Sequence, residues 1–121
     1  MDIPNSCSQY DCATIKEVYD YTKERVIVHN ERRSRHRNTD PVSLNLDIAC
    51  QAKKWAEHMA VNNAWGHAPS SERPGQGENL AMSGTTGTPG ELVPEIGWYD
   101  NEEPYYDYST GDFIANAPSN A

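Results

Sequence analysis

The stretch "NLDIACQAKKWAEHMAV", residues 45–61, has the clearest periodic pattern in the chain. Its apolar residues recur at the three- and four-residue spacing of one helix face, and its charged residues fall largely on the other side. Asn45 stands where an N-cap residue is favoured. The pattern predicts a helix over 46–61 whose apolar stripe packs into the core. That stripe consists of Ile48, Ala52, Trp55, Ala56 and Met59.

A second long helix is expected upstream, over residues 14–37, because this stretch contains neither Gly nor Pro. Thr14, followed three residues on by Glu17, has the form of a capping box at the helix start. Pro41 disfavours the helical conformation of the residue before it, so the helix has to end ahead of this point.

Downstream, residues 91–103 predict a third helix, interrupted by Pro94 and Gly97. With three helical blocks and at most two or three short strands, the expected class is α+β with helices in the majority. Residues 1–13 are expected to form an N-terminal lead-in, and residues 14–121 a single domain. A chain of 121 residues has room for one hydrophobic core.

The net charge of −8 is distributed unevenly. Residues 1–63 hold nine acidic and nine basic residues, whereas residues 64–121 hold nine acidic residues and a single base, Arg73. A duplex-binding surface needs Lys and Arg against the phosphates, so a nucleic-acid partner is not expected. The basic run at 31–37 fits the solvated end of a helix, where cations complement the dipole.

Three cysteines leave the redox compartment undecided. Cys7 and Cys12 could pair across a short loop, and Cys50 in a helical pattern fits a small buried hydrophobe. No Cys-x-x-Cys pair is present, which excludes a zinc ribbon. No apolar run approaches the ~20 residues of a transmembrane helix, and the first residues lack the features of an intact signal peptide.

His67 and Glu78 flank a segment rich in Pro, Ser and Gly, "HAPSSERPGQGE". Imidazole nitrogen and carboxylate oxygen are both zinc ligands, so the two residues together would suit a divalent metal. One His and one Glu eleven residues apart are by themselves a weak pattern, and an ordinary surface loop is the simpler interpretation. Neither a phosphate-binding P-loop nor a Gly-x-Ser-x-Gly elbow is present.

Five short motifs occur in order along the chain: "HNERR" (29–33), "LDIACQAKKWAEHMA" (46–60), "GHAPS" (66–70), "GQGENLA" (75–81) and "WYDNE" (98–102). Together and in this order they resemble the motifs of the CAP superfamily. This family includes cysteine-rich secretory proteins, antigen 5 allergens and plant pathogenesis-related proteins of group 1. The resemblance extends over residues 14–108 and is closest to the Golgi-associated plant pathogenesis-related branch.

The resemblance implies an α-β-α sandwich with a wide cleft that holds two histidines and two glutamates, with zinc in some members. The first histidine corresponds to His67 and the first glutamate to Glu78. The second glutamate position is occupied by Asn101, with Glu102 next to it, and the second histidine position by Asp112. The resemblance thus makes these five residues the expected cleft residues, with zinc a candidate cofactor at the two that match.

The resemblance also marks His29, Asn30, Arg33 and Trp55 as residues of the structural motif. The central strands expected near the C-terminus of a CAP domain are not visible in this sequence, so the sandwich is expected to be truncated there. A sheet with an exposed edge favours association. A homodimer, or pairing with full-length relatives, is therefore a candidate assembly.

The function expected from the resemblance is that of a non-enzymatic, secreted binding module. Its cleft would recognise a lipid or sterol, or an extracellular protein. A zinc-dependent hydrolase or protease and a non-functional truncated isoform are the alternatives. A Golgi-associated peripheral membrane location is the alternative to secretion, although the acidic second half disfavours anionic membranes.

Overall fold

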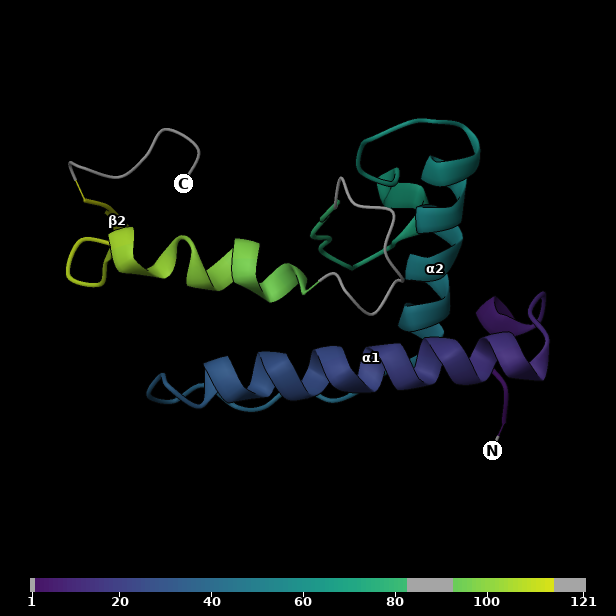
Figure 1. The fold of residues 1–121 in the computed structure, drawn as a ribbon, viewed down its shortest axis with the longest axis horizontal. Helices are drawn as coiled ribbons and strands as arrows, with labels where there is room; N and C mark the ends of the chain where they lie inside the picture. Colours follow the sequence, from purple (N-terminus) through teal and green to yellow (C-terminus); the bar gives the residue numbers. More distant parts are fainter. Residues whose placement is uncertain (1, 83–92, 115–121) are drawn as a thin grey trace. The chain divides into compact units, whose positions relative to one another are not determined.

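A computed structural model describes residues 2–82 and 93–114 of the chain, which divides into two compact units, Met1–Leu80 and Ala81–Ala121. The first unit contains both long helices, and α2 crosses α1 rather than lying alongside it (Figure 1). Among the described residues, no helix combines the length and the apolar character needed to cross a bilayer.

Helix α2 (Leu46–Val61) has the bounds that its sequence predicts. The side-chain oxygen of Asn45 accepts a hydrogen bond from the Ile48 N–H at 3.1 Å, which satisfies one of the free donors at the helix start. Beyond the C-terminus, Asn63 has a φ of 49°, a left-handed conformation that Asn tolerates and that ends helices.

Helix α1 (Cys12–Arg33) begins two residues earlier and ends four residues earlier than expected. Asp11 is its N-cap, because its carboxylate accepts a hydrogen bond from the Thr14 N–H at 2.7 Å. The predicted capping box at Thr14 was therefore wrong, since Thr14 already lies inside the helix. At the other end, Arg33 Nε donates to the carbonyl of Asp40 at 2.6 Å and helps to hold the returning chain.

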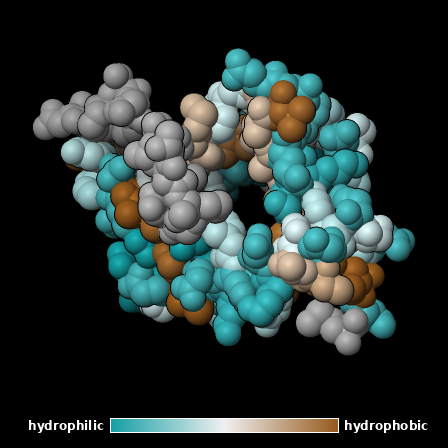
Figure 2. Space-filling view, turned by 45° about the vertical axis from the view of Figure 1, so that its right-hand side comes forward, coloured by the Kyte–Doolittle hydropathy of each residue, from teal (hydrophilic) through white to brown (hydrophobic). Residues whose placement is uncertain are grey.

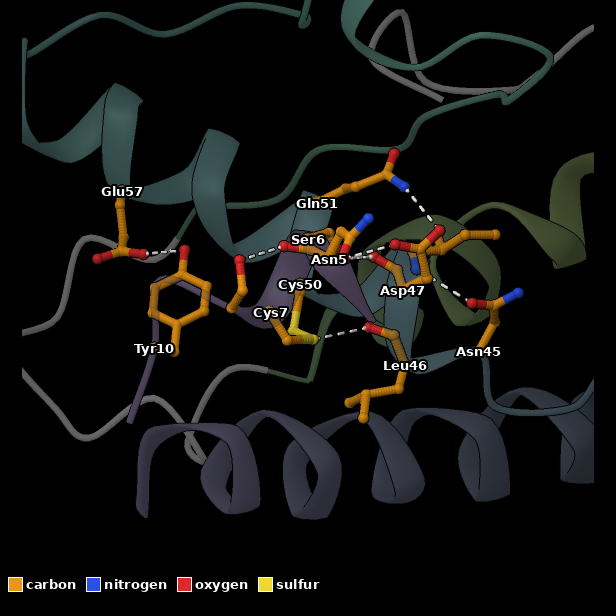
Figure 3. Close-up of a disulfide and its surroundings, with 12 residues drawn as sticks. Asn5, Ser6, Cys7, Tyr10, Asn45, Leu46, Asp47, Cys50, Gln51 and Glu57 are labelled. Carbon is orange, nitrogen blue, oxygen red and sulfur yellow. Dashed lines mark hydrogen bonds between the residues drawn. A yellow bond between two sulfur atoms is a disulfide. The ribbon is translucent and has the colours of Figure 1, made fainter. Parts of the chain in front are cut away.

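A disulfide joins the short helix η1 (Asn5–Cys7) to α2 through Cys7 and Cys50, whose Cα atoms are 5.3 Å apart (Figure 3). The sequence had left a pairing of Cys7 with Cys12 open, but this pairing does not form, and Cys12 is free and exposed. Cys50 is buried as expected, but it is a bridge and not an isolated apolar side chain. Because η1 lies directly on α2, the "lead-in" is part of the folded unit.

Polar contacts on both sides of the disulfide hold η1 and the turn after it to α2 (Figure 3). Ser6 Oγ donates to Oδ1 of Asp47 at 2.5 Å, and Tyr10 Oη donates to Oε1 of Glu57 at 2.6 Å. Burial of Tyr10 raises the pKa of its phenol, and the hydrogen-bonded carboxylate of Glu57 raises it further. The N-terminal segment is thus attached to α2 at three points.

The core of the first unit is small and centres on the disulfide. Cys7, Cys50 and Val18 of α1 are buried, and four partly buried residues pack against them. These four are Tyr10, Ile15, Leu46 and Ala49.

The apolar stripe of α2 lies outside this core, contrary to the prediction. Ile48 is 43% exposed, Ala52 is exposed, and Trp55 is only half-buried. The reason is that η1 and α1 pack on the side of α2 that carries Cys50. In Figure 2 the hydrophobic residues form separate brown patches among hydrophilic ones. The stripe is therefore available to line a groove.

The return from α1 to α2 is held by Asn30, one of the expected motif residues. Its Nδ2 donates to the carbonyl of Val42 at 2.9 Å, and its Oδ1 accepts from the Val42 N–H at 2.7 Å. The side chain of Asn30 therefore bonds both backbone groups of Val42, as a neighbouring β-strand would. His29, next to it, turns back onto its own helix, with Nδ1 3.0 Å from the carbonyl of Arg25.

The second unit is built from short elements. A π-helical turn η4 (Ile96–Asp100) and a turn η5 (Glu103–Tyr105) precede a hairpin of β1 (Tyr106–Asp107) and β2 (Asp112–Phe113). The strands pair antiparallel, and Gly111 provides the positive φ of 75° that the turn requires. The expected helix over 91–103 is thus shorter, and its first two residues lie outside the described part.

These elements make the chain α+β, as expected. The sheet that the structure describes within 2–82 and 93–114 has two strands.

Candidate functional site

His67 follows the turn that leaves α2. The indole Nε1 of Trp55 donates to the carbonyl of Gly66 at 2.9 Å, so α2 fixes the backbone immediately before the histidine. The next residue, Ala68, is buried, while the His67 side chain itself is 59% exposed. Trp55, expected as a core residue, therefore positions the site residue instead.

Glu78 returns to the same point from the far end of the loop. His67 Nδ1 donates to Glu78 Oε1 at 2.6 Å, and the backbone N–H of Ala68 donates to the same oxygen at 3.0 Å. The carboxylate is 16% exposed, and Arg73 Nε lies 4.0 Å from it. The structure thus brings together the two residues that the sequence singled out.

Arg73 is the residue of this site that sequence reasoning treated only as a lone charge. Its Nε donates to the carbonyl of Ala68 at 2.9 Å, and its Nη1 donates to the carbonyl of Gln76 at 3.0 Å. It therefore ties the two sides of the loop together beneath Glu78. Its position as the only base in the second half of the sequence was the available signal.

These surroundings favour the ionised form of Glu78. Partial burial opposes ionisation, but the hydrogen bonds from His67 and Ala68 and the charge of Arg73 outweigh it and lower the pKa of the carboxyl group. Glu78 is therefore a carboxylate at neutral pH, held by charge-assisted hydrogen bonds.

The arrangement can orient an imidazole. A carboxylate on Nδ1 sets the tautomer and directs Nε2 outward, as in the outer shell of many metal sites. A zinc ion, however, needs three or four protein ligands. Within residues 2–82 and 93–114 no group of three His, Cys, Asp or Glu side chains is placed to hold a metal, and the pair supplies two donors. The His67–Glu78 pair by itself therefore does not make a zinc site.

A groove with a volume of about 500 Å³ opens beside Glu78. Its floor is the apolar stripe of α2, with Ile48, Ala52 and Trp55, and the loop that carries Glu78 forms the opposite wall. This volume is within the range of small-ligand sites, ~300–1,000 Å³. The groove was missed from sequence because the stripe was assigned to the core.

Asn101, Glu102 and Asp112 belong to the second unit and stay predictions. Asn101 is exposed just beyond η4, where its N–H bonds to the Ile96 carbonyl at 2.9 Å. Glu102 is half-buried in the next turn, and Asp112 is exposed in β2, where it accepts a hydrogen bond from the N–H of Phe113 at 2.8 Å.

Two curated proteins are similar to this chain. Golgi-associated plant pathogenesis-related protein 1 of Homo sapiens is 30% identical over 99 residues, which cover 78% of this chain and 64% of the human protein. Protein PRY2 of Saccharomyces cerevisiae is 32% identical over 95 residues, which cover 78% of this chain and 28% of the yeast protein. The human relative bears the name of the branch that the motifs resemble.

The chain belongs to the CAP superfamily. No family model and no solved structure matches it. This CAP chain spans less than two thirds of the length of either relative.

Proposed function

We propose that this CAP chain is a non-enzymatic binding module that recognises a lipid, a sterol or a protein partner in the groove beside Glu78. The observation that carries the proposal is the exposed apolar stripe of α2, which faces an open groove instead of the core. A concave surface with an apolar floor and a few placed polar groups is the usual form of a binding site.

The state of Glu78 supports binding over hydrolysis. Its Oε1 already accepts two hydrogen bonds, so the carboxylate acts as a fixed link between the loop and His67. A zinc-dependent hydrolase would need a metal with an open coordination position and a free general base. The two-donor pair provides neither, so the hydrolase is not the function proposed.

The proposed setting is extracellular, with peripheral association at the Golgi as the alternative. The name of the human relative places that protein at the Golgi. The disulfide is typical of proteins that fold in an oxidising compartment. We also propose that the family's α-β-α sandwich is the arrangement in which this groove works.

The experiment compares two apolar positions of the same helix. Ile48→Glu places a charge on the groove floor, whereas Val61→Glu does so at a residue that is 84% exposed and outside the groove. Palmitate, cholesterol and a set of short peptides are titrated into the isotope-labelled chain, and backbone amide shifts are recorded by NMR. We expect shifts along α2 and the 66–79 loop that Ile48→Glu removes and Val61→Glu leaves. Shifts confined to other regions with every probe would refute the proposal.

A further inference from the structure

Side-chain carboxamides form a large part of the lining of the groove beside Glu78. Five of its residues are Asn or Gln, and they come from three separate segments of the first unit: η1 and the turn after it, α2, and the loop before Leu80. These residues are Asn5, Gln9, Gln51, Gln76 and Asn79. A carboxamide presents the same donor and acceptor groups as a peptide bond.

Two of the amides form a fixed link across the groove. Gln76 Nε2 donates to Gln51 Oε1 at 3.1 Å, and Gln51 Nε2 donates to Oδ2 of Asp47 at 3.2 Å. The chain of bonds runs from α2 to the loop and sets the orientation of both amide planes. Among the described residues no group donates to Oε1 of Gln76, so this oxygen can accept a hydrogen bond from a ligand.

Two further amides are unbonded. Across residues 2–82 and 93–114, the side chains of Asn5 and Asn79 make no hydrogen bond, and both residues are exposed. The amide groups of Asn5 and Asn79, together with the Gln51–Gln76 link, provide hydrogen-bond donors and acceptors along the groove. They lie beside the apolar floor that contains Ile48 and Trp55.

The charges of the lining balance. Lys54 and Arg73 contribute two positive charges, and Glu72 and Glu78 contribute two negative charges, in a chain whose net charge is −8. The groove therefore has no excess charge that would attract a strongly anionic headgroup or a strongly cationic partner. The groove therefore selects a neutral occupant.

We propose that the occupant is an extended, uncharged peptide segment of a protein partner. Its backbone N–H and C=O groups pair with the groove amides, and its apolar side chains rest on the α2 stripe. An acyl chain or a sterol would cover the same amides without giving them partners, which costs free energy. This inference rests on the proposed function and specifies the partner of that same groove.

The test starts from a library of phage-displayed octapeptides, panned on the full chain and counter-selected on the Ile48→Glu chain. Enriched peptides are synthesised with acetyl and amide caps and titrated into the isotope-labelled protein. We expect uncharged sequences that shift the side-chain NH₂ signals of Gln51, Gln76, Asn5 and Asn79. The paired substitution Asn5→Ala with Asn79→Ala should weaken peptide binding by about fivefold or more. Val61→Glu should leave it unchanged.

The lipid arm separates the two proposals. Palmitate and cholesterol are titrated into the same variants, each of which is first shown by circular dichroism to melt like the parent. Lipid binding that needs Ile48 but ignores the two asparagines, with no enriched peptide, would overturn the peptide inference and keep the proposed function. If neither peptide nor lipid shifts the groove signals, both proposals fail. Enriched peptides that bind equally well without the asparagine amides would also overturn the inference.

Discussion

Removing the Cys7–Cys50 disulfide is expected to cost the first unit a large part of its stability. The bridge links η1 to α2 across a sequence separation of 43 residues, and both cysteines are fully buried. The loop-closure relation for a ring of this size gives about 4 kcal/mol at 25 °C. Domains of ordinary stability unfold with only ~5–15 kcal/mol, so this loss is a major fraction of the total.

The core adds to the expected loss. In the cluster around the bridge, Val18 is the one buried residue besides the two cysteines. Little buried apolar area therefore remains to hold η1 on α2 when the disulfide is removed. The polar contacts of Ser6 with Asp47 and of Tyr10 with Glu57 are partly exposed and depend on η1 remaining in place. Without the bridge, η1 is expected to leave α2.

The assay is urea unfolding followed by circular dichroism, with Cys7→Ala/Cys50→Ala compared against the parent and against Cys12→Ser. The double variant should unfold at a much lower urea concentration. Cys12→Ser should stay within about 0.5 kcal/mol, because this thiol is free and exposed. Thiol titration of the denatured, oxidised parent should find one thiol per chain. Three thiols, or a double variant within 1 kcal/mol of the parent, would refute the reasoning.

Three other predictions concern single side chains. Glu78→Gln should destabilise the chain by about 2 kcal/mol at pH 7. The pKa of Glu78 is lower in the folded chain than in the unfolded chain, where it is ~4.3. The stability difference should therefore be complete above pH ~4.3 and should fade as the pH falls through the pKa of the folded state. Urea melts at pH 7 and pH 3 measure it. Asn30→Ala should cost about 1–3 kcal/mol of stability, because the N–H and the carbonyl of Val42 both lose their hydrogen-bond partner. The loop around Val42 should then be cleaved faster by proteases. Unchanged cleavage there would contradict the role given to Asn30. Trp55→Phe keeps an aromatic ring but removes the bond to the Gly66 carbonyl, so about 1 kcal/mol is expected in thermal melts, and an unchanged melting temperature would show that the bond is unimportant.

The motifs around the two candidate site residues and the chemistry of their side chains pointed to different interpretations. His67 and Glu78 were recognised because family motifs surround them, and their chemistry alone favoured an ordinary loop. Their hydrogen bond of 2.6 Å depends on how the loop closes, and Arg73 bonds both sides of that loop. A spacing of eleven residues cannot indicate whether the two ends of such a loop meet.

Local rules were sufficient for α2 and failed elsewhere for a physical reason. The extent of α2 and its Asn45 cap follow from contacts between residues within four positions of each other, which the sequence displays directly. The start of α1 was misplaced because two caps, Asp11 and Thr14, competed within one turn. The carboxylate of Asp11 accepts the hydrogen bond from the Thr14 N–H, so the helix begins at Cys12.

The sequence by itself determined the family, the second helix and the α+β class, and it singled out His67 and Glu78 as candidate site residues. Only the tertiary structure decided that Cys50 bonds to Cys7, and that the apolar stripe of α2 lines a groove. Periodicity shows that a helix has an apolar face, but it does not show which other segment packs on which face. That choice depends on where η1 and α1 meet α2, which is set by contacts between residues some forty positions apart, such as the disulfide across 43 residues.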